Sequence, residues 1–537
     1  MSTIRIVAAQ LNLSGAALKV NTQAIIEAIQ VARDQQQADL IVFPELAVCG
    51  YLSEDLLLQQ DFHHRVQQAV AQICAKTIGI AVVLGYPEQT TAGLFNAASL
   101  MVEGQIMAIY HKQFLANQGV FDEYRYFVPG QSPCIFTFKG VCFTLLICED
   151  LWHPMPLQAA VAAGAQCALV LNASPFEPDK AERRQANIQQ RAAETLCPIL
   201  SVNTVGGQDD LVFDGGSLAV DGRGVLKAQA AFMQAQLLTV ELEANTWRPQ
   251  PLLALPSVSA RNWQALKLAL GDYVRKNHFS EVLLGVSGGI DSALTLVLAV
   301  DTLGSAQVRA VLLPSRYTTA LSMELAQDLC QRLSVNMQVI SIEPGFQALL
   351  QSIGLDPHTP PLEKRVENMQ ARCRGLLLMA LSNQTAALLL NTTNKSELAV
   401  GYGTLYGDLI GGFAPLKDIL KTEVYRLAEY RNQLGPTPLL SEALLRRPPT
   451  AELRPEQCDE DSLLPYNLLD AILKRYLEEG KSLTAIVAEG FVASQVRQVI
   501  AWVDGSEFKR RQAPIGPRIS TKAFGRDRRY PLQLDNP

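Results

Sequence analysis

The sequence lacks several features that mark whole classes of protein. It has no uninterrupted apolar run of the roughly 18 residues that a membrane span needs, so no membrane-spanning helix is expected. Charged residues make up only 18% and the net charge is −6, which argues against a general nucleic-acid-binding protein because such proteins carry a large basic excess. Residues 1–15 hold a charge inside their first apolar run, which predicts a strand and not a signal peptide.

Metal-binding and disulfide patterns are also missing. The ten cysteines form no CxxC pair and the six histidines do not cluster near them, which argues against a structural zinc site. Several cysteines lie within apolar runs, where a reduced and buried thiol is expected. Reduced thiols are typical of the cytoplasm, so we expect a cytoplasmic protein.

What the chain does have is a long series of short apolar runs. Its 537 residues, 48% of them hydrophobic, predict two to four domains at about 150 residues per domain. In the first half, the predicted strands span 4–11, 39–46, 80–87, 142–150 and 167–174, and the predicted helices span 20–36, 54–78 and 180–196. Three further runs follow like a meander, at 217–221, 225–230 and 237–243. This pattern predicts an α/β domain whose sheets are covered by helices.

A proline-containing stretch without periodicity, 244–260, separates this half from a second α/β pattern. The second half begins with an amphipathic helix, and its predicted strands and helices then alternate at 281–288, 290 onward, 308–315, 320–333 and 337–343. That alternation predicts a doubly wound parallel (Rossmann-like) sheet with a ligand loop at the end of its first strand. We therefore divide the chain into residues 1–245, a linker 246–261, and residues 262–537.

Two segments of the second half are predicted to be exposed to solvent. Residues 446–462 are rich in proline and charge and are typical of a surface loop. Residues 509–530 carry eight Lys and Arg side chains against a single acid, Asp527. We expect most of this basic stretch to be solvated, with Lys509 and its neighbours able to close over nucleotide phosphates.

Three side chains of complementary chemistry each follow an apolar run of the first half. Glu45 stands in VFPEL, Lys112 in IYHKQFL and Cys148 in LLICEDLW. Strand ends meet at the edge of a sheet, so these side chains are predicted to come together there. A thiolate is a nucleophile, a carboxylate can take the thiol proton, and an ammonium can stabilise charge on a tetrahedral oxygen. On spacing alone, a buried thiol and a surface ion pair explain the three residues more simply.

The residues around them carry more information. FPEL, the His–Lys step, FDEYRYFVPG and CEDLW together resemble the nitrilase, or carbon–nitrogen hydrolase, superfamily over most of residues 3–243. The resemblance implies an αββα sandwich in which a Glu–Lys–Cys triad hydrolyses amides or nitriles through a thioester-type intermediate. The roles that it implies are general base for Glu45, oxyanion-side cation for Lys112, nucleophile for Cys148, support of the triad for Glu123, and glutamine binding for Gln118, Ser174 and Lys180. Longer homologues more often have Tyr near Gln118 and Arg near Lys180.

A glycine-rich turn between a strand and a helix is the second chemical feature. In LLGVSGGIDSALTL, Gly288 and Gly289 let backbone N–H groups approach a phosphate, and the helix N-terminus favours an anion. A Walker A loop would need GxxxxGK[ST], and that lysine is missing here. The loop is therefore predicted to hold a leaving pyrophosphate, and Asp291 can bind Mg²⁺ together with phosphate oxygens. A bare SGG turn, by contrast, also occurs at ordinary strand–helix junctions.

The longer motif SGGxDS resembles the pyrophosphate loop of the N-type ATP pyrophosphatases, which several amidating families share. Segments 367–383, 388–408, 411–428 and 508–518 resemble NAD synthetase, over most of residues 262–530. The resemblance implies ATP-binding residues Gly285, Val286, Ser287, Gly288, Gly289, Ile290, Asp291, Ser292 and Thr392. It implies deamido-NAD-binding residues Asn368, Arg372, Glu397 and Lys509, Mg²⁺ ligands Asp291 and Glu397, and further contributions from Asp408 and Lys417.

The two halves together resemble the glutamine-dependent NAD synthetases. The resemblance implies a cytoplasmic homo-oligomer acting on glutamine, ATP and deamido-NAD, with Mg²⁺ as cofactor and no nucleic-acid or membrane partner. Ammonia from glutamine would amidate an NAD-adenylate, releasing AMP, pyrophosphate and glutamate. The alternatives are another amidotransferase with the same pyrophosphate loop, such as a GMP synthetase, and a metabolite sensor with inactive sites. Residue 2 is Ser and no GxCxG elbow accompanies Cys148, which argues against the usual glutaminases of the first alternative.

Overall fold

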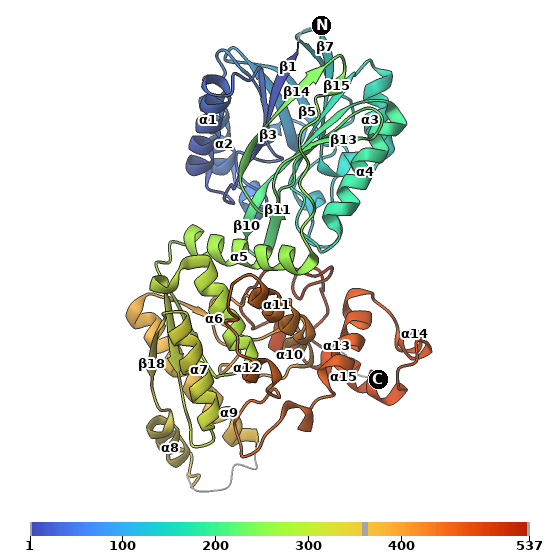
Figure 1. Cartoon of the computed structure of the whole chain (residues 1–537). Helices are drawn as coiled ribbons and strands as arrows, with labels where there is room; N and C mark the ends of the chain where they lie inside the picture. The colour runs from blue at the N-terminus through green and yellow to red at the C-terminus, as the bar shows by residue number, and fades with distance from the viewer. Residues whose placement is uncertain (1–2, 357–363, 534–537) are drawn as a thin grey trace. The chain divides into compact units, whose positions relative to one another are not determined.

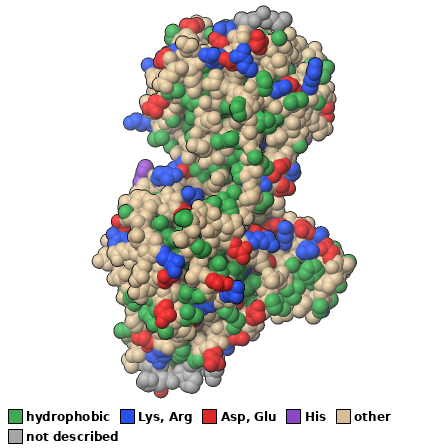
Figure 2. All heavy atoms as spheres, in the orientation of Figure 1, with side chains coloured by type: hydrophobic (Ala, Val, Ile, Leu, Met, Phe, Trp, Pro, Cys, Tyr) green, Lys and Arg blue, Asp and Glu red, His purple; other side chains and the backbone are tan. Residues whose placement is uncertain are grey.

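The structure is a computed structural model that describes residues 3–356 and 364–533. The chain separates into two compact units, Met1–Pro256 and Ser257–Pro537, and each is described by itself. On the visible face of each unit, Lys and Arg side chains are interspersed with Asp and Glu side chains (Figure 2).

Two β-sheets form the centre of the first unit (Figure 1). The seven-stranded sheet has the order β15-β14-β1-β2-β3-β4-β5, with strands β1 (Ile4–Gln10), β2 (Leu40–Val42), β3 (Ala81–Thr90), β4 (Gly93–Val102), β5 (Gln105–His111), β14 (Gln236–Glu243) and β15 (Thr246–Trp247). The six-stranded sheet has the order β13-β12-β9-β8-β7-β6, with strands β6 (Ile135–Phe138), β7 (Val141–Ile147), β8 (Cys167–Asn172), β9 (Ile199–Asn203), β12 (Leu218–Val220) and β13 (Leu226–Gln229). A separate pair joins β10 (Val205–Gln208) to β11 (Leu211–Asp214).

Helices cover the outer faces of both sheets. Along β1, Ile6 and Ala8 belong to the core between the sheets, whereas Val7 and Ala9 belong to the core beneath the first two helices. This alternation follows from the period of two along a strand. The helices of this unit are α1 (Leu18–Asp34), α2 (Gln60–Cys74), α3 (Pro154–Ala162) and α4 (Lys180–Thr195), with short helices η1 (Glu54–Leu58), η2 (Glu123–Arg125) and η3 (Cys148–Trp152). The αββα sandwich is confirmed.

The predicted meander is wrong in its last strand. The runs at 217–221 and 225–230 form β12 and β13, which pair antiparallel. The run at 237–243, however, forms most of β14, which leaves this sheet and pairs with β1 in the other one. Residues 246–247 then pair with β14, and residues 258–261 already belong to the first helix of the second unit.

The second unit is built on a four-stranded parallel sheet in the order β18-β17-β16-β19. Its strands are β16 (Val282–Gly285), β17 (Val308–Leu312), β18 (Asn336–Val339) and β19 (Leu388–Leu390). The chain runs outward from β16 to β18 and then returns to the other side of β16. This reversal makes a switch point between β16 and β19, which is where ligands bind in such sheets. The predicted doubly wound fold is confirmed.

The crossovers of this sheet are α6 (Ile290–Leu303), α7 (Ala320–Arg332), α8 (Glu343–Ser352) and α9 (Lys364–Thr385). Phe346 of α8 and Cys373 of α9 share an apolar core with Leu283 of β16. The other helices are α5 (Val258–Lys276), α10 (Lys395–Val400), α11 (Lys421–Gln433), α12 (Glu442–Arg446), α13 (Tyr466–Leu473), α14 (Leu483–Ala488), α15 (Ala493–Gly505) and α16 (Glu507–Arg510), with short helices η4 (Ser305–Gln307), η5 (Asp459–Asp461) and η6 (Lys474–Glu478). Among the described residues, no helix combines the length and apolar character that crossing a bilayer requires.

Candidate active sites

The three predicted catalytic side chains of the first unit come from two different sheets. Glu45 follows β2 and Lys112 follows β5, both in the seven-stranded sheet, whereas Cys148 follows β7 in the six-stranded sheet. The prediction that one sheet edge gathers them is therefore wrong. The residues still meet, because the two sheets face each other across a shared core.

Lys112 is the centre of a buried cluster. Its Nζ atom lies 2.6 Å from Oε1 of Glu45 and 3.0 Å from Oε1 of Glu123, and all three side chains are at most 3% exposed. Each carboxylate is also held by neutral donors. The side-chain amide of Asn96 donates to Glu45 at 2.8 Å, and the backbone N–H of Ala173 donates to its other oxygen at 2.9 Å. These bonds fix the orientation of Glu45.

Burial and the charges of this cluster determine whether the Cys148 thiol is protonated. Burial raises the pKa of the Cys148 thiol well above its ordinary value, and the Glu45 carboxylate raises it further, while Lys112 opposes both. Burial alone would lower the pKa of Lys112, but Glu123 and Glu45 together raise it well above its usual range. The lysine is therefore a permanent cation and the thiol is protonated at neutral pH. A base must remove the thiol proton before Cys148 can attack.

Of the three predicted glutamine-binding residues, Ser174 has a direct connection to this cluster. Ser174 is buried and follows the Ala173 N–H that binds Glu45; its own backbone N–H donates to Oδ1 of Asn203 at 2.9 Å. Nζ of Lys180 lies 5.5 Å from the ring centre of Trp152, which belongs to the same short helix as Cys148. Gln118 is exposed in the loop after Lys112, so its connection to the site is the weakest of the three.

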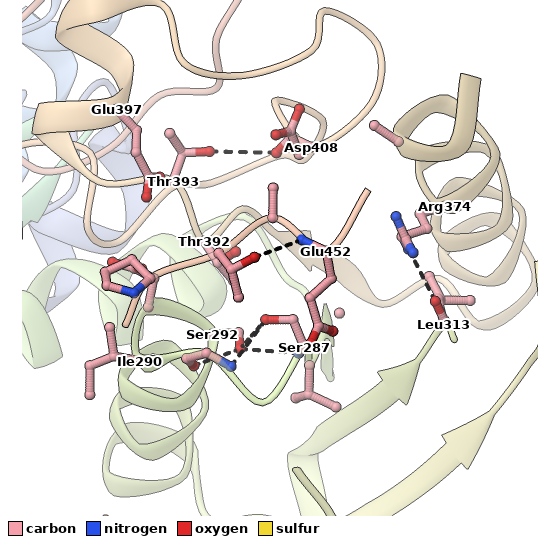
Figure 3. Close-up of a pocket in the computed structure, with 18 of the residues that line it drawn as sticks. Ser287, Ile290, Ser292, Leu313, Arg374, Thr392, Thr393, Glu397, Asp408 and Glu452 are labelled. Carbon is pink, nitrogen blue, oxygen red and sulfur yellow. Dashed lines mark hydrogen bonds between the residues drawn. The ribbon is translucent and has the colours of Figure 1, made fainter. Parts of the chain in front are cut away.

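The pyrophosphate-type loop of the second unit lies at the switch point of the parallel sheet. Gly288 has φ +74°, a conformation that favours glycine. The hydroxyl of Ser292 donates to the carbonyl of Gly289 at 3.0 Å and accepts from the backbone N–H of Ser287 at 3.2 Å. Figure 3 shows these two serines together at one end of the pocket. The turn is thus closed on itself, with the N-terminus of α6 behind it.

A pocket adjoins this loop and the ends of β16 and β19. Of the predicted ATP-binding residues, those that line it are Gly285, Val286, Ser287, Gly289, Ile290, Asp291, Ser292 and Thr392. Gly288 forms the turn behind them. Residues of the segment 447–453 complete the wall, so the loop that was predicted to be exposed contributes to the pocket. That part of the prediction is wrong for Arg447 and Glu452, which form an ion pair of 2.7 Å with side chains at most 14% exposed.

The two predicted magnesium ligands share one cation. The ammonium of Lys421 donates to Asp291, and it lies 3.3 Å from Oε1 of Glu397. Burial raises the pKa of Glu397 to about 8, with Asp291 adding to the effect and Lys421 opposing it. Among the residues that the structure describes, no group of three His, Cys, Asp or Glu is arranged to hold a metal. Two carboxylates that already bind one cation fit Mg²⁺ only if phosphate oxygens complete its ligands.

The predicted deamido-NAD residues divide into two groups. Glu397 lines the pocket, whereas Asn368, Arg372 and Lys509 all contact the loop 401–405. Oδ1 of Asn368 accepts from Thr404 at 2.7 Å, and Nζ of Lys509 donates to the carbonyls of residues 401 and 403 at 2.7 Å. These three side chains therefore meet at one loop.

The two further candidates, Asp408 and Lys417, have different surroundings. Asp408 lines the pocket, while Nζ of Lys417 donates to the carbonyl of Pro514 at 2.6 Å. Sequence reasoning missed other pocket residues: Lys421, Arg374, Arg447, Glu452 and Asp459. Lys421 and Arg374 had a local signal, since they lie in the segments 411–428 and 367–383 that resemble NAD synthetase.

Part of the basic stretch after residue 508 is buried. Arg510, Arg518 and Arg528 are at most 6% exposed. Arg510 and Arg528 both donate to Glu507, at 2.9 and 3.0 Å, and Arg518 pairs with Asp527 at 2.6 Å. The prediction of a solvated tail is wrong for these three arginines, because Glu507 and Asp527 pair with them in the fold. Arg511 and Arg529 are exposed.

Comparison with known proteins gives both units a family. The carbon-nitrogen hydrolase family profile matches residues 5–251, and the NAD synthase profile matches residues 262–513. The glutamine-dependent NAD(+) synthetase of Xanthomonas campestris pv. campestris is 48% identical over 99% of this chain and 97% of its own. The structure of the glutamine-dependent NAD+ synthetase from Acinetobacter baumannii in complex with ADP has a TM-score of 0.80 at 40% identity, covering 99% of this chain and 98% of its own. A synthetase structure from Cytophaga hutchinsonii, at 22% identity and TM-score 0.85, covers 100% and 98% and shows the same fold.

Proposed function

Because the chain belongs to the glutamine-dependent NAD(+) synthetases, we propose that it amidates deamido-NAD to NAD with ammonia taken from glutamine. The first unit is the glutaminase and the second is the ATP-dependent synthetase. The observation that carries the proposal is the buried Glu45–Lys112–Glu123 cluster beside Cys148 in a chain that also holds an SGGIDS loop at a sheet switch point.

In the glutaminase, Glu45 takes the proton of the Cys148 thiol, and the thiolate attacks the side-chain carbonyl carbon of glutamine. Lys112 stabilises the negative charge on the carbonyl oxygen. The C–N bond breaks and ammonia leaves with a proton delivered from Glu45. Water then attacks the thioester carbon, releasing glutamate and restoring the thiol. Gln118, Ser174 and Lys180 hold the glutamine, and Glu123 orients Lys112.

In the synthetase, an oxygen of the nicotinate carboxylate of deamido-NAD attacks the α-phosphorus of ATP, and pyrophosphate leaves. Ammonia then attacks the adenylated carboxyl carbon, which releases AMP and gives NAD. The N–H groups of the loop and the N-terminus of α6 bind the leaving pyrophosphate. Asn368, Arg372, Glu397 and Lys509 lie on the deamido-NAD side, and Thr392 contacts ATP.

Asp291 and Glu397 would hold Mg²⁺ in this unit, because they are two carboxylates beside the phosphate-binding turn. When bound, that ion would neutralise charge on the pyrophosphate. Lys421 already supplies one positive charge at the same carboxylates. Its ammonium would be available to the phosphates if a metal ion were bound by the two carboxylates.

We propose domain limits of 1–245 and 262–537 with a linker at 246–261, a cytoplasmic location and a homo-oligomeric state. The NAD synthase profile, which begins at residue 262, and the division at residues 256 and 257 support a boundary within 246–261. The other profile runs to residue 251, and residues 246–247 and 258–261 belong to β15 and α5. All ten cysteines are free thiols, which supports a reducing compartment.

We also propose that ammonia passes between the units shielded from water, since ammonia in neutral water is mostly protonated and then is not a nucleophile.

The test is a substrate panel scored by AMP and pyrophosphate release. We expect release with deamido-NAD and either glutamine or ammonia, with one glutamate formed per NAD in the glutamine reaction. Release with a different acid would identify another amidotransferase. Binding of glutamine and nucleotide without AMP release would identify a sensor and overturn the proposal.

A further inference from the structure

Asp150 lies two residues after Cys148 in η3 and has no exposed surface. Its carboxylate accepts four hydrogen bonds from two separate parts of the chain, residues 110–114 and Ile147. Oδ1 accepts the backbone N–H groups of Gln113 and Phe114 at 2.9 and 2.8 Å. Oδ2 accepts the hydroxyl of Tyr110 at 2.8 Å and the backbone N–H of Ile147 at 3.0 Å.

These partners surround the two residues whose separation matters for the glutaminase. Tyr110 and Gln113 flank Lys112, at the end of β5 in the seven-stranded sheet. Ile147 directly precedes Cys148, at the end of β7 in the six-stranded sheet. One carboxylate therefore ties together the strand ends of two sheets. The seven-stranded sheet positions the Lys112 ammonium at this point, and the six-stranded sheet positions the Cys148 sulfur.

The backbone of the nucleophile needs such support. Cys148 has φ +45°, which is unusual for a residue other than glycine and costs roughly 1–2 kcal/mol. The bond from Ile147 N–H to Asp150 closes the turn in which this strained residue lies. Burial raises the pKa of Asp150 to about 6, so the carboxyl group is ionised at neutral pH and can accept all four hydrogen bonds.

We propose that Asp150 is a positioning residue of the glutaminase, which sets the separation between the Lys112 ammonium and the Cys148 sulfur without touching the substrate. This inference rests on the proposed glutaminase function. Misplacement of reacting groups by about 1 Å lowers rates by about 100-fold. Loss of the four-way contact is therefore expected to lower kcat for glutamine and to leave the binding of glutamine nearly unchanged.

The test is Asp150→Asn in the full chain, because an amide of the same size accepts at only one of its two ends. If its oxygen keeps the bonds from Gln113 and Phe114, its NH2 group faces the N–H of Ile147, and the bond next to Cys148 is lost. We expect kcat for glutamine hydrolysis to fall about 100-fold, with KM for glutamine within about threefold of wild type. NAD formation from added ammonia should stay unchanged. This rate serves as a control for the amount of folded protein in the same sample.

A second readout concerns the sulfur itself. Lys112 lowers the pKa of the Cys148 thiol, so a displaced ammonium moves the pH dependence of Cys148 alkylation by iodoacetamide to higher pH. A role in folding alone would lower the active fraction without this shift. Tyr110→Phe is the matched control. It removes the hydrogen bond from Tyr110 to Asp150 and the bond from the Gln113 side-chain amide to Tyr110, but it keeps the three backbone N–H bonds to Asp150, so kcat stays within about threefold of wild type.

Amide hydrogen exchange of the wild-type protein tests the same contacts even if Asp150→Asn fails to fold. We expect the N–H groups of Gln113, Phe114 and Ile147 to exchange slowly. Fast exchange at these three amides would overturn the proposal, as would an Asp150→Asn variant with wild-type kcat, or a Tyr110→Phe variant as impaired as Asp150→Asn. If the wild-type protein shows no glutaminase activity, the proposed function fails first, and the two failures are thereby distinguished.

Discussion

A Cβ atom on Gly288 would lie 2.3 Å from the backbone carbonyl oxygen of Ser322. Ser322 belongs to the first turn of α7, so this helix packs directly against the pyrophosphate-type turn. Backbone cannot move aside as a flexible side chain can. The turn therefore depends on glycine twice, for this close approach and for its φ of +74°.

We expect Gly288→Ala to disable the synthetase. The left-handed φ costs about 1–2 kcal/mol for alanine, and overpacking against backbone costs a further 1–3 kcal/mol or so. AMP formation with either glutamine or ammonia should fall at least about tenfold, because the displaced turn no longer presents its N–H groups to pyrophosphate. Steady-state AMP release and thermal unfolding measure the two effects.

Gly480→Ala is the matched control for this variant. Gly480 has φ +66° in the same unit, but a Cβ there would meet nothing within 4 Å. The free energy of unfolding should fall by about 1–2 kcal/mol with AMP formation unchanged. Equal loss of AMP formation in both variants would show that general destabilisation, and not the contact with Ser322, explains the first result.

Removal of the nucleophile should separate the two activities. We expect Cys148→Ala to lower glutamine-driven NAD formation by about 1,000-fold or more, as loss of a catalytic nucleophile does. NAD formation from added ammonia should continue within about twofold of wild type, because the pocket of the second unit contains no residue of the first. Loss of the ammonia-driven reaction in a folded Cys148→Ala protein would contradict separable sites.

The sequence predicted best what depends on neighbours along the chain. Glu45, Lys112 and Cys148 were found because each of them follows an apolar run. The SGGIDS loop was found because its six residues contain both a glycine turn and the start of a helix. It predicted least well what depends on distant partners. Nothing beside Arg528 indicates that Asp504 and Glu507, more than 20 residues earlier in the chain, pair with it in the interior.

The same reason explains the errors in topology. Residues 237–243 continue the alternation of the two preceding runs, yet their partner is β1, more than 200 residues earlier in the chain. Cys148 likewise was expected at the edge of the same sheet as Glu45, because strand ends alone do not say which sheet a strand joins. Arg447 and Glu452 look like loop residues until the fold brings Ser322 beside them.

The reactivity of Cys148 should depend on pH in a way that reports its surroundings. Because burial and Glu45 raise its pKa well above the ordinary value, the thiolate fraction is small and grows tenfold per pH unit. We expect the rate of carboxamidomethylation of the Cys148 peptide by iodoacetamide, followed by mass spectrometry, to rise through pH 9 without a plateau.

Two variants should shift this rate in opposite directions. Glu45→Gln removes the carboxylate that raises the thiol pKa, so alkylation at pH 8.5 becomes faster although turnover of glutamine is lost. Lys112→Met removes the charge that lowers the thiol pKa, so alkylation becomes slower. A wild-type plateau below pH 8, or the same direction of change in both variants, would contradict this electrostatic account.

The last prediction concerns the carboxylates around Lys421. Asp291 lies in the first turn of α6, where it also accepts a hydrogen bond of 2.9 Å from Asn394. We expect Asp291→Asn to raise the Mg²⁺ concentration for half-maximal AMP formation by at least about tenfold, a loss of about 1.4 kcal/mol in metal binding. Glutamine hydrolysis by the first unit should continue.

Asp301→Asn is the matched control for this variant. Asp301 lies at the other end of the same helix, where it pairs with Arg431 at 2.8 Å, and its replacement removes an equal charge. The Mg²⁺ requirement should stay unchanged. An equal shift in both variants would mean that the helix carboxylates act only through the overall charge of the unit, and Asp291 would then not be a ligand.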